Sequence, residues 1–92
     1  MRKITALAVD AFENGKRFHQ GNMMVRGDEM YLFRNRIAWR NERGVLSVSL
    51  CGWDTVTTRE RLNGLQGVAV YKRKGITHLN GIPWDGSEIA IR

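Results

Sequence analysis

The stretch that decides the fold is residues 23–51, MMVRGDEMYLFRNRIAWRNERGVLSVSLC. Apolar and polar residues alternate along it, a pattern typical of strands with one buried face. Turn-forming residues interrupt it at Gly27-Asp28, Asn35-Arg36 and residues 41–44. We expect four antiparallel strands here, because each connection is far too short for a parallel crossover.

The pairing that these turns impose predicts which face is buried. They pair Val25 with Met30, and they place Trp39 opposite both Leu32 and Leu46. The expected core face carries Met23, Val25, Met30, Leu32, Ile37, Trp39, Leu46, Val48 and Leu50. The expected outer face carries Met24, Tyr31, Phe33, Ala38, Arg40, Ser47 and Ser49, with Arg36 at a turn. A slip of one residue would exchange the two faces of a strand.

The rest of the chain predicts two helices and a second hairpin. Apolar residues at helical spacing indicate a helix over residues 2–14, packed on the core face, and His19 to Gly21 then form a connector. Thr57 and Glu60 form a capping box for a short helix over residues 57–63. Residues 68–72 and 76–79 flank Arg73-Lys74-Gly75 in either of two registers, and residues 88–91 are a candidate edge strand. We expect one α+β domain over residues 1–92, an antiparallel meander with two short helices in the order α-β-β-β-β-α-β-β.

The charge of the chain favours a polyanionic partner. Fifteen Lys and Arg against nine Asp and Glu give a net charge of +6. Such an excess suits nucleic acid or an acidic protein surface, although solubility alone would also explain it. The single cysteine, Cys51, excludes an internal disulfide and fits a reducing compartment. No apolar run reaches membrane-spanning length, so we expect no membrane partner.

Two basic clusters are the candidate binding site. The residues that we expect to bind nucleic acid or a partner are Arg34, Arg36, Arg40, Arg43 and Tyr31 in the meander, and Lys72, Arg73 and Lys74 at the second hairpin. Aromatic rings beside arginines on an open sheet can stack on bases and meet phosphates. The alternatives are that Tyr31 and Phe33 lie in a second small core, and that the hairpin charges only keep an edge soluble.

No residue set predicts an enzyme. His19, His78 and Cys51 lack spaced partners for metal binding or nucleophilic attack, and the glycines form no phosphate-binding motif. We therefore expect no catalytic residue, no metal, no cofactor and no small-molecule substrate. Dimerisation is neither indicated nor excluded.

Several segments resemble small proteins of tailed bacteriophages. They are residues 8–12 (AVDAF), 52–53 (GW), 57–65 (TTRERLNGL), 79–81 (LNG) and 84–86 (WDG). The resemblance implies a phage accessory protein in the cytoplasm of the host bacterium. Anti-CRISPR inhibitors are prominent among such proteins, and they mostly block host ribonucleoproteins without catalysis. Many are acidic DNA mimics, which this basic chain is not.

The most specific expectation from this resemblance is an inhibitor of a multi-subunit CRISPR surveillance complex that contacts the guide RNA or its protein channel. The alternatives are a basic DNA- or RNA-binding phage regulator and a structural protein of the virion.

Overall fold

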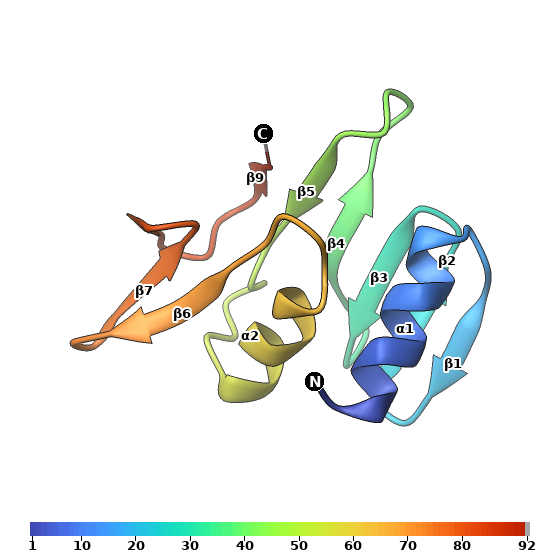
Figure 1. The fold of residues 1–92 in the computed structure, drawn as a ribbon, viewed down its shortest axis with the longest axis horizontal. Coiled ribbons are helices and arrows are strands. Elements are labelled where there is room, and N and C mark those ends of the chain that lie inside the picture. Colours follow the sequence, from blue (N-terminus) through green and yellow to red (C-terminus); the bar gives the residue numbers. More distant parts are fainter. Residues whose placement is uncertain (92) are drawn as a thin grey trace.

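The computed structural model describes residues 1–91 as an α+β fold (Figure 1). In chain order the elements are α1 (Lys3–Glu13), β1 (Phe18–Gln20), β2 (Met23–Arg26), β3 (Glu29–Leu32), β4 (Asn35–Arg40), β5 (Leu46–Val48), α2 (Val56–Asn63), β6 (Val70–Arg73), β7 (Ile76–Leu79), β8 (Ile82–Pro83) and β9 (Ile89–Ala90). The expected fold class and the approximate order are confirmed, and the candidate edge strand at residues 88–91 is present as β9. Short strands are added at His19 and at Pro83. No helix among the described residues is long and apolar enough to cross a bilayer.

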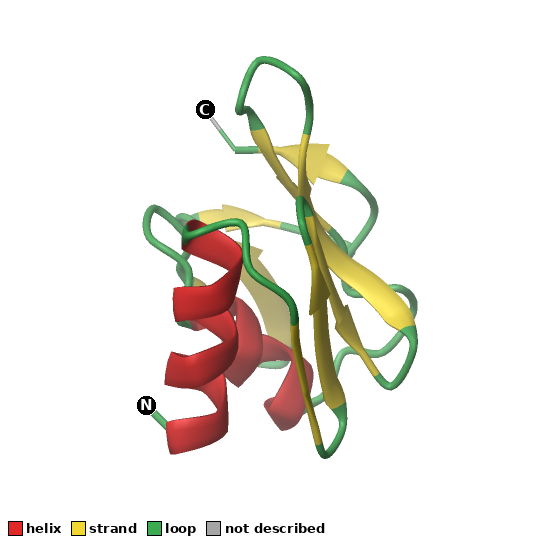
Figure 2. Cartoon of the chain, turned by 90° about the vertical axis from the view of Figure 1, so that its right-hand side faces the viewer, coloured by secondary structure: helices red, strands yellow, loops and turns green. Residues whose placement is uncertain are grey.

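The main sheet is covered on one side only. Its six strands run in the order β1-β2-β3-β4-β5-β9, and all neighbours are antiparallel. Both helices lie on the same side of it, with α1 over β1 to β3 and α2 beside β4 (Figures 1 and 2). The opposite side, seen to the right of the helices in Figure 2, carries no helix formed by residues 1–91.

The hairpin of β2 and β3 has the expected register. Met23 pairs with Leu32 and Val25 with Met30 around a turn at Gly27-Asp28, and all four side chains are buried. The side chains pack under α1, whose Ala8 and Phe12 are buried in the same core. This part of the sheet follows directly from the alternation of apolar residues.

The expected turn at Asn35-Arg36 is wrong. The chain turns two residues earlier, at Phe33 and Arg34, which have φ of 50° and 69°. Both values suit the two-residue turns that match strand twist, although Asn and Gly are the usual residues there. Sequence preference therefore favours Asn35, but that residue instead begins β4, opposite Leu32.

A β-bulge then shifts the rest of β4. Tyr31 pairs with Arg36 while Met30 pairs with Ala38, so Ile37 is an extra residue on β4. A bulge lets two successive residues face the same side, and Ile37 and Ala38 are both buried.

The bulge exchanges the expected faces of the residues that follow it. Trp39 pairs with Glu29 and Ser47, on the side opposite Leu46, so it does not belong to the core face. Ala38 and Arg40 were expected on the outer face and instead lie on the helix side.

Helix α2 begins earlier than the capping box predicted. Thr55 is the N-cap, and its side chain accepts a hydrogen bond from the Thr58 N–H at 3.1 Å. Glu60 instead accepts a hydrogen bond from the Thr5 hydroxyl at 2.6 Å, which joins α2 to α1. The helix ends before Gly64, as expected. A Cβ at Gly64 would come within 2.7 Å of the Thr5 methyl, so the close approach of the two helices requires glycine.

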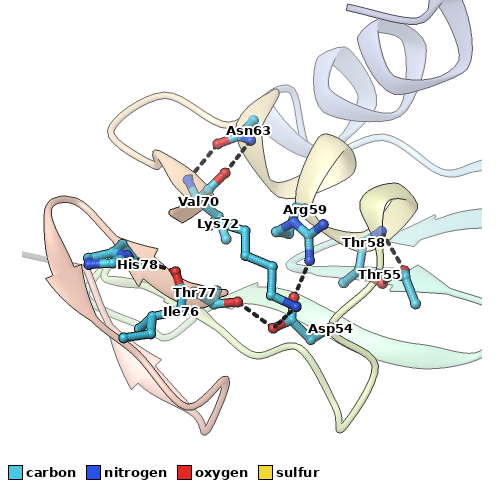
Figure 3. A network of polar contacts seen from close by, with 10 residues as sticks. All are labelled: Asp54, Thr55, Thr58, Arg59, Asn63, Val70, Lys72, Ile76, Thr77 and His78. Atoms are coloured by element: carbon cyan, nitrogen blue, oxygen red, sulfur yellow. Dashed lines mark hydrogen bonds and ion pairs between the residues drawn. The ribbon is translucent and has the colours of Figure 1, made fainter. Parts of the chain in front are cut away.

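The second hairpin forms a separate three-stranded sheet, in the order β6-β7-β8. Arg73 pairs with Ile76 around a turn at Lys74-Gly75, which selects one of the two registers that the sequence allows. Asp54 ties this sheet to α2, because its carboxylate accepts hydrogen bonds from Thr77 and Arg59 (Figure 3). The hairpin extends away from the main sheet (Figure 1). Arg73 and Lys74 make its tip basic.

Candidate partner-binding surface

The uncovered side of the main sheet brings aromatic and basic side chains together. We call it the open face and define it by residues that cross-strand pairing places on one side: His19, Met24, Arg26, Glu29, Tyr31, Arg36, Trp39 and Ser47. Alternation along the strands puts these side chains opposite the core. Tyr31 and Trp39 are half-buried there, which leaves part of each ring accessible.

Glu29 organises the centre of the open face. Its Oε2 accepts a hydrogen bond from Arg36 Nη1 at 2.9 Å, and its Oε1 accepts one from the Tyr31 hydroxyl at 3.0 Å. The hydrogen bonds from Arg36 and Tyr31 lower the pKa of Glu29, and the same bond to Glu29 raises the pKa of Tyr31. The carboxylate is therefore ionised at neutral pH and holds both partners.

Arg36 also lies over an aromatic ring. Its Cζ is 4.0 Å from the centroid of the Trp39 ring, a cation–π contact. Because Glu29 and Trp39 both hold it, the guanidinium loses little freedom when a partner arrives. The sequence pattern assigned Trp39 to the core, and only the bulge at Ile37 places its ring on this surface.

The other cations predicted from the meander are not gathered on the open face. Arg34 and Arg43 are exposed at opposite ends of β4, and neither forms an ion pair within residues 1–91. Arg40 was expected beside Tyr31, which is wrong, because it lies on the helix side. There it stacks over Phe12, with Cζ 4.8 Å from the ring centroid, and pairs with Glu13 at 3.1 Å.

The second basic cluster is divided in the same way. The Lys72 side chain runs toward Asp54, and its Nζ lies 3.8 Å from Asp54 Oδ2 (Figure 3). Arg73 and Lys74 are exposed at the tip and form no ion pair among the described residues. Arg73 and Lys74 are therefore better placed than Lys72 to meet a partner.

An aromatic pair on the second hairpin was missed by the sequence analysis. Tyr71 and His78 are cross-strand neighbours whose rings stack with centroids 5.2 Å apart, nearly parallel. Their side of the hairpin is opposite the buried Val70 and Leu79. A two-residue turn at Lys74-Gly75 would have paired these residues from the sequence, but a second register was equally compatible with it.

The candidate nucleophile and the histidines lie in separate elements. His19 is in β1, His78 is in β7, and Cys51 follows β5. Cys51 is half-buried, and its Sγ donates a hydrogen bond to the Arg36 carbonyl at 3.0 Å. Within residues 1–91, no three His, Cys, Asp or Glu side chains gather as a metal-ligand set.

The position of Phe33 differs from both interpretations of the sequence. These placed it either in a second small core or on an outer strand face. It lies instead at the β3–β4 turn, with 64% of its surface exposed. A large ring held in water at a turn is available for contact.

Comparison with known proteins identifies one family. The family model described as "Kyanoviridae Gp96 protein" matches residues 1–88. Neither the curated proteins nor the solved structures give a match. The match covers nearly the whole chain, so the chain belongs to the Kyanoviridae Gp96 family and is a protein of tailed phages.

Proposed function

We propose that this phage protein is a non-enzymatic binding protein that docks on a nucleoprotein complex inside the host cell. Its open face would meet the nucleic acid of that complex. The observation that carries the proposal is the arrangement of Arg36, held over Trp39 by Glu29 and next to Tyr31. Aromatic rings and guanidinium groups on an uncovered sheet suit unpaired bases.

The role of each residue follows from its exposure and charge. Tyr31 and Trp39 offer ring surface on which bases can stack, which tolerates any sequence because every base has a π face. Arg34 and Arg43 lie at the two ends of β4 without an ion pair among the described residues, and they are placed to contact phosphates on either side. The negative charge of Glu29 repels phosphate at the centre of the open face. We therefore expect bases, rather than phosphates, to contact the protein there.

The finer form of the proposal is inhibition of a defence complex. A protein that covers guide RNA, or the channel that holds it, would block a multi-subunit CRISPR surveillance complex without catalysis. The net charge of +6 supports contact with RNA phosphate or acidic protein residues. No cofactor or small-molecule substrate is part of this proposal.

Capture of the partner from host cells tests the proposal. Tagged wild-type protein and a Tyr31→Ala, Arg36→Glu double variant are used to recover partners, with and without nuclease treatment. We expect a protein partner that the wild type retains after nuclease treatment and that the double variant recovers poorly. A Lys3→Glu variant is the matched control, because it changes the net charge by the same two units at an exposed cation in α1, away from the open face.

Three outcomes would contradict this proposal. Recovery of nucleic acid alone would favour a phage regulator that binds DNA or RNA directly. Equal recovery by wild type and a folded open-face variant would mean that this surface is only solvated. Loss of partner capture in a folded His78→Ala, Cys51→Ser variant, whose two residues lie outside the open face, would reopen the question of catalysis.

A further inference from the structure

An apolar cavity lies beside the β3–β4 turn, where the chain also leads into α2. Its volume is about 270 Å³. The buried side chains of Leu32, Ile37 and Leu50 line its interior. Phe33 and Trp53 line it as well, and these rings are 64% and 60% exposed, so they form its mouth. Two large aromatic rings in water at the entrance of an apolar cavity are suited to holding a flat ligand.

The backbone around this cavity is strained. Phe33, Arg34 and Cys51 have φ of 50°, 69° and 53°, and they are three of the five non-glycine residues with positive φ among residues 1–91. Asn and Gly would form the β3–β4 turn with less strain. Strained backbone conformations are concentrated at functional sites, where a particular side chain is retained although its backbone conformation is unfavourable. Here the strained β3–β4 turn places the Phe33 ring at the mouth of the cavity.

The polar groups at the cavity indicate which flat ligand fits. Asn35 lines the cavity on the same side as its strand partner Leu32, and its side chain has no hydrogen-bond partner among residues 1–91, so its amide is free to donate and accept. An asparagine amide matches the donor and acceptor pattern on the edge of adenine. Arg34 is exposed beside Phe33 and has no ion pair in the described chain. An aromatic mouth, an available amide and an exposed cation together match a base and its phosphate.

We propose that this cavity takes one unstacked base of a single-stranded nucleic acid, with Phe33 and Trp53 stacking on it and Asn35 reading its edge. The inference rests on the proposed function and names a specific subsite for it. Arg36 faces the open side of β4, and the preceding residue, Asn35, faces the helix side together with Leu32. A strand that crosses the open face therefore has to pass around the β3–β4 turn, past Phe33 and Arg34, to reach the cavity.

Fluorescence anisotropy with labelled adenine-only and uridine-only RNA oligonucleotides tests the subsite. Phe33→Ala and Trp53→Ala should each weaken binding about 5- to 100-fold, as expected when one base can no longer stack. The dependence on salt should not change, because neither ring carries a charge that neutralises phosphate, whereas Arg34→Ala should flatten it. Asn35→Ala should reduce the preference for adenine over uridine. Ile82→Ala is the matched control, since Ile82 is an apolar side chain, 69% exposed, on the other sheet.

The outcomes separate this inference from the proposed function. If Tyr31→Ala weakens binding but the Phe33, Trp53 and Asn35 variants bind as wild type does, the subsite is overturned and the open face stands. If wild-type protein binds no oligonucleotide at low salt, the nucleic-acid contact of the proposed function is overturned.

Nuclear magnetic resonance of the wild-type protein tests independently whether the cavity binds a base. This measurement does not depend on the folding of any variant. Adenosine monophosphate should shift the Asn35 side-chain amide and the Trp53 indole N–H, while ribose 5-phosphate should not. Shifts caused by N-acetylphenylalaninamide but not by adenosine monophosphate would overturn the inference in favour of an apolar side chain of a protein partner.

Discussion

Among single residues, Asp54 stands out because it joins the second hairpin to α2. Its carboxylate accepts hydrogen bonds from Thr77 in β7 and Arg59 in α2, and Lys72 lies 3.8 Å away (Figure 3). Burial acts to raise the pKa of Asp54, but the hydrogen bonds from Thr77 and Arg59 and the charge of Lys72 outweigh it. The pKa is therefore lowered below the ordinary value of 3.8. The folded state thus favours the ionised form.

We expect Asp54→Asn to destabilise the protein most at neutral pH. About a third of the Asp54 side chain is exposed, so solvent screening limits the loss to about 1 kcal/mol, or about 4–8 °C in melting temperature. Because the folded pKa is the lower one, the stabilisation is fully present above the ordinary pKa and is lost as the pH falls through the folded value. Thermal melting from neutral to acid pH should show the two curves converging below about pH 4.

Glu42→Gln is the control for this prediction, because it also removes one negative charge but comes from an exposed loop residue without an ion pair in the described chain. If the difference in melting temperature between wild type and Asp54→Asn stayed constant down to acid pH, the Asp54 side chain would stabilise the fold through its packing rather than through its charge.

Among the secondary-structure elements, β4 decides through its β-bulge which residues face a partner. The alternation in β2 and β3 could be predicted from the sequence, because the turn there agreed with the apolar pattern. The register of β4 could not, because nothing in the sequence marks Ile37 as an extra residue. Each apolar residue from Ile37 to Trp39 fits a core position equally well by type. The packing of Ile37 and Ala38 side by side in the core, which only the tertiary structure reveals, places Trp39 on the open face.

The bulge predicts unequal effects of truncating neighbouring residues. Ile37 is 1% exposed, so Ile37→Ala should lower the free energy of unfolding by about 2–5 kcal/mol through a cavity in the core. Trp39 is half-buried and contacts Arg36, so Trp39→Ala should cost only about 1 kcal/mol, despite the larger side chain. Urea unfolding of the two variants measures both values. A larger loss for Trp39→Ala would place the indole in the core, as an unbulged β4 requires.

Across the whole molecule, the net charge of +6 indicates that a polyanion is favoured as a partner, whereas the positions of the exposed cations indicate where it would bind. The sequence shows where basic residues are concentrated along the chain, but it could not tell which of these cations are neutralised, because their partners are distant in the chain. Arg40 meets Glu13 from α1, and Lys72 meets Asp54 from the segment before α2. Among the cations predicted to bind, four are exposed and form no ion pair within residues 1–91. They lie at three separate turns of the two sheets and are Arg34, Arg43, Arg73 and Lys74. A partner that follows them has to extend from the main sheet to the hairpin tip.

This distribution predicts how the hairpin tip contributes to binding. Arg73→Glu with Lys74→Asn removes both exposed cations, and asparagine tolerates the φ of 52° at position 74, so the turn should remain intact. If the tip meets single-stranded phosphates, the slope of log K against log salt should fall by about 0.7 for each phosphate that the variant no longer neutralises. Melting temperature should change little, since both side chains are exposed.

The measurement is oligonucleotide binding between about 50 and 200 mM salt, a range in which phosphate contacts strongly alter affinity. Lys3→Glu with Lys16→Asn serves as the matched control, because it changes the net charge equally but on and just after α1. The expected effect depends on position rather than on total charge, so the two variants must differ. Equal flattening of the salt dependence by both would mean that the protein attracts nucleic acid through its overall charge, and that the tip serves to keep the edge of the hairpin soluble.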